Sequence, residues 1–315
     1  MSKVLINDTT LVAIGDAIRE KNGTTDTYKP SEMPAAILSI SGSSDGDTTI
    51  EDDLIQKTVS GTYTNNRVTT VGYGIFANCS NLNAVSMQNV TSIDSYGFYH
   101  CYNLNTINMP NVTTIGKQAF YGCRALSTPF ETMFPNVISV GENAFQRSSL
   151  TTLESSTLTT IEEEAFHDCD NLTTVDLPNA TSIGTYAFYA CNKLTTVILP
   201  NVTNIEENIF QSCDALNTVD ITNATTIKGY AFYGSGITSL ILRKTDTIVT
   251  LSGVITYTFR NTPIASGTGY IYVPSALIDT YKADSKWTTY TDQFRALEDY
   301  TVDGTTTGAL DETKI

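Results

Sequence analysis

Phenylalanine recurs at a nearly constant interval along most of this chain. Each copy occupies the same place in a shared template, which the stretch SIGTYAFYACNKLTTVILP, residues 182–200, shows in full. Most steps between copies are 22 residues, and the exceptions are steps of 25 and 21. A fixed period of this size predicts a solenoid, in which each unit buries its apolar face only against its neighbours. The positions are Phe76, Phe98, Phe120, Phe145, Phe166, Phe188, Phe210 and Phe232.

Each copy divides into short segments that predict its cross-section. In the copy that begins at Leu194, apolar and polar residues alternate as in a short strand, and Pro200 with Asn201 forms a corner. A second short extended segment follows, and we expect a helical turn over residues 206–213 to bring Phe210 into the core. The corner asparagine recurs, and such a column can hydrogen-bond along the stack and satisfy corner backbone groups. Its members are Asn89, Asn111, Asn136, Asn179, Asn201 and Asn223.

All six cysteines stand three residues after a repeat phenylalanine, so they form a second column. Neighbouring coils of a parallel stack lie about 4.8 Å apart, a distance that by itself permits disulfides. The cysteines fall into two blocks of three consecutive coils, however, and pairing neighbours would leave one thiol over in each block. We therefore expect buried, reduced thiols, with serine as a near-isosteric substitute at Ser148 and Ser235. The column comprises Cys79, Cys101, Cys123, Cys169, Cys191 and Cys213.

The charge balance excludes several classes of partner. With Lys+Arg 18 against Asp+Glu 33, the formal net charge is −15, and no basic cluster is present. Binding to nucleic-acid phosphates or to an anionic membrane surface needs such clusters, so we expect neither partner. No window of about 18 apolar residues occurs, and the first residues lack the apolar segment of a signal peptide. We therefore expect no membrane insertion, and a chain that folds in the cytoplasm where it is made.

No arrangement of residues in the sequence favours catalysis. His100 and His167 lie in different copies at different distances from the repeat phenylalanine, and there is no G-x-S-x-G, H-E-x-x-H or phosphate-loop motif. The glutamates at 162–164 and 206–207 could act as paired carboxylates, but their turn position favours solvated surface. The acidic segment 45–53 lacks the spacing of a calcium loop, and a straight column of sulfurs does not form a zinc tetrahedron. The sequence therefore predicts a non-enzymatic protein with no metal and no cofactor.

Tyrosines gather around the repeat phenylalanine. One set follows that residue directly, and another stands two residues before it. Because the phenylalanine already takes the direction of the core, we expect at least some of these rings to lie outside, in a stripe along the long axis. They either shield the core or form a ridge that binds sugar or protein, since tyrosine combines a large contact area with a polar tip. The candidate binding residues are Tyr96, Tyr99, Tyr121, Tyr186, Tyr189, Tyr230, Tyr233 and Tyr257.

A row of polar residues along the predicted strand face offers a second candidate surface. It contains Thr173, Thr195, Asn217 and Thr238. Threonine is also a good strand residue in its own right, so this row has a purely structural interpretation as well.

The copy IGTYAFYACNKLTTVILPNVTNI, residues 183–205, resembles the BspA-like class of leucine-rich repeat, whose unit follows I-x-x-x-A-F-x-x-C-x-x-L-x-x-V-x-L-P. The resemblance covers residues 68–262. It implies an α/β repeat solenoid of short parallel strands with turns and short helices. Residues 46–67 are expected to cap its start. One coil is lengthened at 132–135.

The last part of the chain resembles the terminating segment that follows such repeats. Residues 270–297 carry this resemblance, and the cap is expected to span residues 263–300. Its Tyr281, Trp287 and Phe294 are expected to cover the open end of the core. The coil before it, around Phe259, departs from the template. An acidic tail, residues 301–315, lacks periodicity and is expected to be loosely ordered.

A second resemblance concerns the start of the chain. Residues 11–40, LVAIGDAIREKNGTTDTYKPSEMPAAILSI, predict two short helices around a turn, with Ser31 as the N-cap of the second. This stretch is similar to a short module near the start of tail and baseplate-associated proteins of phages that infect Gram-positive bacteria. The resemblance implies a small helical attachment module with its linker over residues 1–45, which would contact other virion proteins. Phage proteins of this role are commonly homotrimers, so the resemblance also implies a homotrimer.

These observations favour a non-enzymatic component of a phage tail or baseplate, which folds in the host cytoplasm and resides in the virion. Its repeat surface would bind a receptor on the host cell, either a glycan or a protein. The alternative is a BspA-like adhesin on a bacterial cell surface, which needs a secretion signal and an anchor that the sequence does not display. A glycan-acting enzyme is a third hypothesis, which the lack of a catalytic arrangement disfavours.

Overall fold

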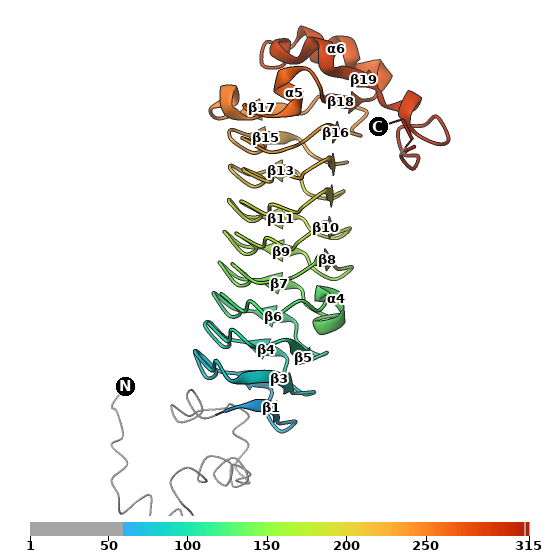
Figure 1. Ribbon diagram of the computed structural model, residues 1–315. Coiled ribbons are helices and arrows are strands. Elements are labelled where there is room, and N and C mark those ends of the chain that lie inside the picture. Colours follow the sequence, from blue (N-terminus) through green and yellow to red (C-terminus); the bar gives the residue numbers. More distant parts are fainter. Residues whose placement is uncertain (1–58, 312, 315) are drawn as a thin grey trace, which may run out of the picture.

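The chain folds into a stack of coils around one long core. The computed structural model describes residues 59–311, 313 and 314. The coils follow one another from the blue end to the red end of the stack, and neighbouring strands are parallel (Figure 1). The predicted repeat solenoid is therefore confirmed. The predicted helical module over residues 1–45 lies outside the described residues.

The first side of each coil carries a short strand whose apolar residues face the core. Like residues pair in register: Val175 lies beside Val197, which lies beside Val219, and all three are fully buried. These strands form one sheet of β1 (Gly61–Thr64), β3 (Leu82–Ser86) and β5 (Thr106–Asn108), and a second sheet of β8 (Thr152–Glu154), β10 (Thr174–Asp176), β12 (Thr196–Ile198), β14 (Thr218–Asp220), β16 (Ser239–Ile241), β18 (Tyr270–Val273) and β19 (Phe294–Ala296).

The second side carries shorter strands, which follow the asparagine corner. Each places one apolar residue in the core, such as Ile183 or Ile205. They form one sheet of β2 (Thr70–Val71), β4 (Ser92–Ile93), β6 (Thr114–Ile115), β7 (Ser139–Val140), β9 (Thr160–Ile161) and β11 (Ser182–Ile183), and another of β13 (Asn204–Ile205), β15 (Thr226–Lys228) and β17 (Thr250–Ser252).

The third side, called the turn side below, consists of tight turns. Residues 206–213 do not form the predicted helical turn, because Asn208 and Ser212 adopt left-handed backbone conformations with φ of 59° and 58°. A right-handed helix cannot continue through such residues. Left-handed residues recur in the other coils two positions before and two after the repeat phenylalanine, as at Tyr96 and His100. The turns therefore belong to the repeat itself.

One helix interrupts the first side. The helix α4 (Phe130–Met133) stands between β5 and β8, in the coil that the sequence predicts to be lengthened. Phe130, Met133 and Phe134 are fully buried, and the ring of Phe130 packs edge-on against Phe145 with centroids 5.6 Å apart. The extra residues therefore enlarge the core locally.

The repeat phenylalanines form a continuous ladder inside the stack. All eight predicted rings are fully buried, and successive centroids lie between 5.0 and 5.7 Å apart with interplanar angles of 17° or less. Phe259, from the coil expected to be irregular, adds a ninth ring, 5.4 Å from Phe232. Burying one such ring stabilises the fold by roughly 1.5–3 kcal/mol. The ladder is therefore a main source of stability.

The cysteine and asparagine columns lie where the sequence predicts. All six cysteines are buried and none forms a disulfide within the described part of the chain. The Sγ of Cys101 donates to the backbone carbonyl of Phe76 at 2.9 Å, and Cys213 makes the same contact to Phe188 at 3.0 Å. Asn201 donates from Nδ2 to the carbonyl oxygen of Pro178 at 2.6 Å. Both columns therefore tie neighbouring coils together by hydrogen bonds to backbone groups.

The far end of the ladder is covered by the C-terminal segment. The ring centroids of Trp287 and Phe259 lie 6.1 Å apart, and Nε1 of Trp287 donates to the carbonyl oxygen of Val249 at 2.8 Å. The hydroxyl of Tyr281 accepts from the backbone N–H of the same valine, and Phe294 is buried beside it. The remaining helical elements are η1 (Ile255–Tyr257), α5 (Pro263–Ser266), η2 (Ser275–Leu277), α6 (Ile278–Ala283), η3 (Thr288–Gln293) and η4 (Leu297–Tyr300).

The start of the acidic tail folds back on the stack, so the expectation of a loosely ordered tail is wrong for this part. Arg243 donates from Nη1 to the carbonyl oxygens of Thr306 and Gly308, at 2.7 and 3.0 Å. The same guanidinium bonds both carboxylate oxygens of Asp220 through Nε. Burial raises the pKa of Asp220, and the Arg243 charge opposes that shift. This largely buried ion pair anchors the tail.

Candidate functional site

The eight predicted tyrosines, called the tyrosine ridge below, lie on the turn side of the stack. All eight are half-buried, so none belongs to the core and each keeps part of its ring accessible. The sequence predicts one stripe, but the rings gather in three groups. The coils between the groups carry Asn143 and Gln146 or Asn208 and Gln211 at the equivalent positions. The ridge is therefore interrupted by polar coils.

The N-terminal group is the largest. The ring of Tyr99 stacks on Tyr121 at 5.2 Å and on His100 at 3.9 Å, and Tyr96 lies 5.5 Å from Tyr99. Burial, followed by neighbouring tyrosines, raises the pKa of Tyr99. The pKa of His100 is lowered by burial and by nearby arginines, which favours the neutral ring. The group therefore presents a continuous aromatic surface without a fixed positive charge on the imidazole.

Besides His100, three further members of this group were not among the predicted site residues. Tyr73 is 71% exposed and lies 5.2 Å from Tyr96, and Tyr102 is 40% exposed and lies 5.0 Å from His100. Arg124 stands 5.8 Å from the centroid of the Tyr102 ring. Tyr73 is found at three residues before the repeat phenylalanine and Tyr102 at four after it, so a search restricted to the two nearest columns misses both.

The C-terminal group is a compact stack. Tyr230 and Tyr257 lie 4.8 Å apart with an interplanar angle of 6°, and Tyr233 lies 5.9 Å from Tyr230. Arg260 stands 5.0 Å from the centroid of Tyr257, within the range of a cation–π contact. This group therefore presents flat aromatic faces beside one positive charge.

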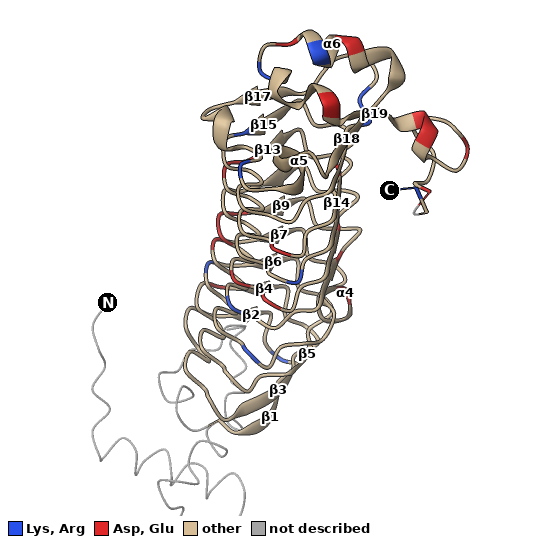
Figure 2. Ribbon diagram, turned by 45° about the horizontal axis from the view of Figure 1, so that its top comes forward, with Lys and Arg blue, Asp and Glu red and all other residues tan. Residues whose placement is uncertain are grey.

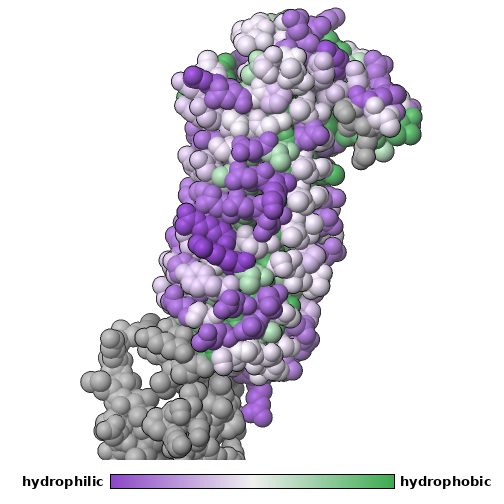
Figure 3. All heavy atoms as spheres, viewed as in Figure 1, coloured by the Kyte–Doolittle hydropathy of each residue, from purple (hydrophilic) through white to green (hydrophobic). Residues whose placement is uncertain are grey.

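The middle group combines rings with charged residues. Tyr189 lies 4.7 Å from His167, whose Nδ1 is 3.3 Å from a carboxylate oxygen of Glu164. Asp168 accepts from Nε of Arg147 at 3.1 Å. Asp and Glu mark the turn side of the middle coils in Figure 2, and a strongly hydrophilic band covers this region in Figure 3. The tyrosine ridge is therefore divided by an acidic, ion-paired surface.

Three ridge tyrosines occupy unfavourable backbone conformations. The φ angles of Tyr96, Tyr186 and Tyr230 are 62°, 55° and 60°, in the left-handed region. Glycine and asparagine accept this region readily, whereas a bulky side chain there costs roughly 1–2 kcal/mol. The same column holds Asn143 and Asn208 in other coils. The turn forms without tyrosine in other coils, and the left-handed backbone conformation disfavours a tyrosine at this position.

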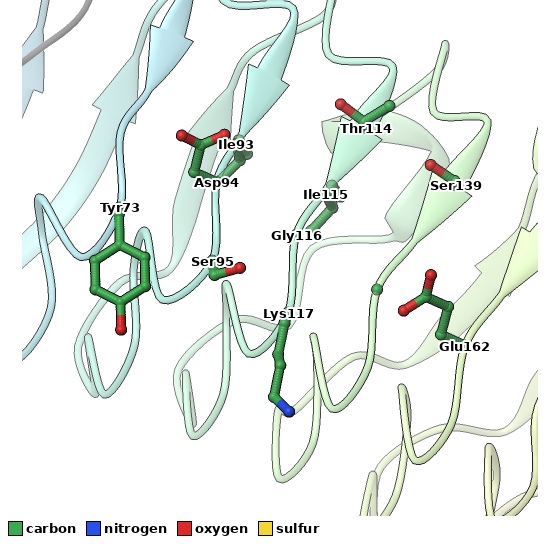
Figure 4. A pocket seen from close by; sticks show the side chains of 11 residues that line it. Tyr73, Ile93, Asp94, Ser95, Thr114, Ile115, Gly116, Lys117, Ser139 and Glu162 are labelled. Carbon is green, nitrogen blue, oxygen red and sulfur yellow. The ribbon is translucent and has the colours of Figure 1, made fainter.

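An open groove of about 450 Å³ adjoins the N-terminal group on the second side of the stack. Tyr73 stands at one end and Glu162 at the other, with Asp94, Ser95 and Lys117 between them (Figure 4). Further residues of β4, β6 and β7 and the two glycines that follow β6 and β7 also line the groove. Sequence reasoning missed this groove, although the column after the second-side strand visibly holds glycine in some coils and Asp or Glu in others.

The alternative surface on the strand face is largely occupied by its own hydrogen bonds. Thr195 donates from Oγ1 to the carbonyl oxygen of Thr173 at 3.0 Å, and Thr173 makes the same contact to Thr151 at 2.9 Å. Thr238 likewise donates to the carbonyl oxygen of Asn217 at 3.2 Å. These hydroxyls stabilise the stack, which supports the structural interpretation of this row.

Neither a metal site nor a membrane-spanning helix is found among the described residues. Among them, no three His, Cys, Asp or Glu side chains are grouped so that they could hold a metal ion. No helix in residues 59–311 combines the length and apolar character that crossing a membrane requires. Burial raises the pKa of Cys169 and Cys213 to about 12, so these thiols are protonated at neutral pH.

Comparison with protein families settles the class of the repeat. The family model described as "BspA type Leucine rich repeat region (6 copies)" matches residues 48–156 and 138–264, which together span more than half of the chain. The chain belongs to this BspA-type leucine-rich repeat family. The match is to a repeat family and not to a catalytic one. No curated protein sequence matches this BspA-type protein.

Solved structures of leucine-rich repeat proteins resemble this BspA-type protein. One from Bacteroides ovatus is 20% identical, with a TM-score of 0.54; the match covers 72% of this chain and 66% of that one, just under two thirds of its length. Another, from T. pallidum, is 23% identical over 53% of this chain and 77% of that one, with a TM-score of 0.41. A leucine-rich cell surface protein from Faecalibacterium prausnitzii is 18% identical over 78% and 86%, with a TM-score of 0.29. The first likeness supports the fold alone.

Proposed function

We propose that this chain is a non-enzymatic binding protein of a phage tail or baseplate, which uses the tyrosine ridge to bind a glycan or protein on the host-cell surface. Residues 1–45 attach it to other virion proteins, and the protein acts as a homotrimer. The resemblance of residues 11–40 to phage tail modules supports the virion part of this proposal. The BspA-type solenoid supports the binding part, because its extended exterior suits recognition.

The observation that carries the proposal is the placement of tyrosine at left-handed positions. Tyr186 and Tyr230 are half-buried on the outside of the turn, and asparagine takes the same position at Asn208. The turn imposes this conformation in the described coils, so Tyr186 and Tyr230 stand against a backbone preference that asparagine satisfies at the same position. Local strain of this kind is typical of residues kept for binding. Tyrosine also buries a large area at little entropic cost, which suits a recognition surface.

A second candidate function is a BspA-like adhesin on a bacterial surface, which the family match favours equally. Immunogold electron microscopy of phage particles, and of the bacteria that produce them, separates the two. The virion proposal predicts label at the tail tip. Label on the bacterial wall with none on particles would instead support the adhesin.

The binding role itself is tested by adsorption of the full-length chain to host cells. The double substitution Tyr186→Asn with Tyr230→Asn should lower the affinity at least tenfold, since aromatic contacts dominate such interfaces. Gln118→Asn with Asn208→Gly alters the same left-handed column without removing a tyrosine, so it is the matched control and should bind normally. Equal binding by both double variants would contradict a role for the ridge.

A further inference from the structure

The groove beside the N-terminal tyrosines has the length, volume and open floor of a ligand-binding site. Its residues come from five successive coils, so at about 4.8 Å per coil it extends for roughly 19 Å along the stack. Its volume of about 450 Å³ falls within the usual range for small-molecule sites. Gly116 and Gly141 leave its floor without side chains in the middle. An ideal Cβ on Gly116 would meet the backbone of Asp94 and Ser95 at 2.7–2.8 Å, so close packing of the coils excludes larger residues there.

The polar side chains of the groove are available to a ligand. Thr113, beside the groove, donates to the carbonyl oxygen of Thr91 as part of the stack. By contrast, no hydrogen bond within the described part of the chain involves the side chains of Ser95, Thr114 or Ser139. The carboxylate of Asp94 likewise has no partner among the described residues. Hydroxyl and carboxylate groups placed along one open groove match the donors and acceptors of a polyhydroxylated ligand.

Tyr73 supplies an apolar face at one end of the groove. Its ring is the most exposed tyrosine of the described chain at 71%, and it leans on Tyr96 with centroids 5.2 Å apart. This contact fixes the ring without covering it. A flat apolar surface next to hydrogen-bonding groups suits a sugar ring, which has apolar C–H faces and a polar rim.

The charge of the groove selects the kind of saccharide. Lys117 is held by Glu142 at 2.7 Å, so its charge is largely offset. Glu162 accepts from the backbone N–H of Glu142 at 3.1 Å and stands at the other end of the groove. The carboxylate of Asp94, which also lines the groove, forms no ion pair with any residue that the structure describes. The uncompensated carboxylates give the groove a net negative charge, which repels acidic glycans and phosphate-bearing polymers.

We propose that this groove is a subsite for a short neutral oligosaccharide, with Tyr73 stacking on one sugar ring and Asp94 accepting hydrogen bonds from its hydroxyl groups. The proposal rests on the proposed binding function and specifies its ligand class. The tyrosine ridge beside the groove then contacts more distant parts of the same cell-surface glycan.

Calorimetric titration of the full-length chain tests the subsite. The probes are the neutral tetrasaccharides chitotetraose, maltotetraose, cellotetraose and mannotetraose, with the acidic hyaluronan tetrasaccharide as the charged counterpart. At least one neutral probe should bind and the acidic probe should not. Tyr73→Ala and Asp94→Ala should each weaken that binding at least tenfold. Val302→Ala removes an equally exposed apolar side chain, at 72%, which neither lines the groove nor belongs to the tyrosine groups, so it should leave the affinity unchanged.

Three outcomes would overturn the subsite: no neutral probe binds, the acidic probe binds as well as the neutral ones, or Tyr73→Ala and Asp94→Ala bind like the unaltered chain. Ser139→Phe provides an independent check, because a half-exposed position on the groove wall can carry a ring that blocks it. It should abolish binding without changing the melting temperature. Normal cell adsorption by Tyr73→Ala would reject the groove while leaving the proposed function of the ridge intact.

Discussion

Replacing Tyr230 by asparagine tests whether the tyrosine ridge is separate from the core. Asparagine adopts left-handed backbone readily, so the substitution relieves a conformational cost of about 1–2 kcal/mol. It also removes the stacked pair with Tyr257, which lies 4.8 Å away, and such a pair contributes about 0.5–1.5 kcal/mol beyond area burial. The two effects oppose each other and are similar in size. We therefore expect the free energy of unfolding to change by at most about 1 kcal/mol.

Phe232, two residues further along, provides the contrast. Its ring is fully buried and stacks on Phe210 at 5.6 Å and on Phe259 at 5.4 Å. Truncation to alanine removes these contacts and leaves a cavity, at a cost of about 3–5 kcal/mol. In a domain of this size about 1 kcal/mol shifts the melting temperature by roughly 2–4 °C.

Melting curves followed by circular dichroism separate the two substitutions. Phe232→Ala should lower the melting temperature by about 10 °C, and Tyr230→Asn by less than about 4 °C. A fall for Tyr230→Asn as large as that for Phe232→Ala would refute the reasoning, because the tyrosine would then be a core residue. No fall for Phe232→Ala would refute the ladder.

Three further predictions concern the interior, the ridge and the tail. Because burial raises the pKa of Cys169 and Cys213 to about 12, iodoacetamide at pH 8 should leave both thiols unmodified until the chain is unfolded in guanidinium, and mass spectrometry of the folded protein would reveal any exception. His100 has a lowered pKa in the folded state, so its contribution to stability is present above its ordinary pKa of about 6.5 and is lost as the pH falls. The melting temperature should therefore decrease less from pH 7 to pH 5 in His100→Asn than in the unaltered chain. An identical decrease in the two proteins would contradict this role of His100. Arg243→Met leaves Asp220 buried without its partner, at a cost of about 3–5 kcal/mol, and should expose residues 301–311 to limited proteolysis, whereas unchanged protease resistance would mean that the ion pair does not hold the tail.

Much of the fold follows from the sequence because the repeat period imposes it. Once Phe98 and Phe120 occupy equivalent positions in successive coils, their rings must stack, and the cysteines three residues later must form a second column. The path of the turn does not follow in the same way. Its left-handed positions hold tyrosine, glutamine and glutamate as well as asparagine, so the residue types alone suggested a helical turn.

The candidate site was only partly predictable for a related reason. The ridge residues adjoin the ladder in sequence, so their outward placement follows from the inward direction of the phenylalanine. The groove depends instead on what neighbouring coils lack: Gly116 and Gly141 leave space between Asp94 and Glu162, which lie 68 residues apart in the chain. Such a site becomes visible in a sequence only when the column after the second-side strand is compared across coils.

Hydroxyl-radical footprinting of the chain bound to host cells tests most directly whether the turn side is the recognition surface. Mass spectrometry compares the oxidation of each peptide in the free and the cell-bound protein. The ridge account predicts protection of the peptides that carry Tyr96, Tyr99, Tyr230 and Tyr233, with no change for the strand-face peptide around Thr195. Protection confined to the strand face, with the ridge oxidised as in the free chain, would contradict it.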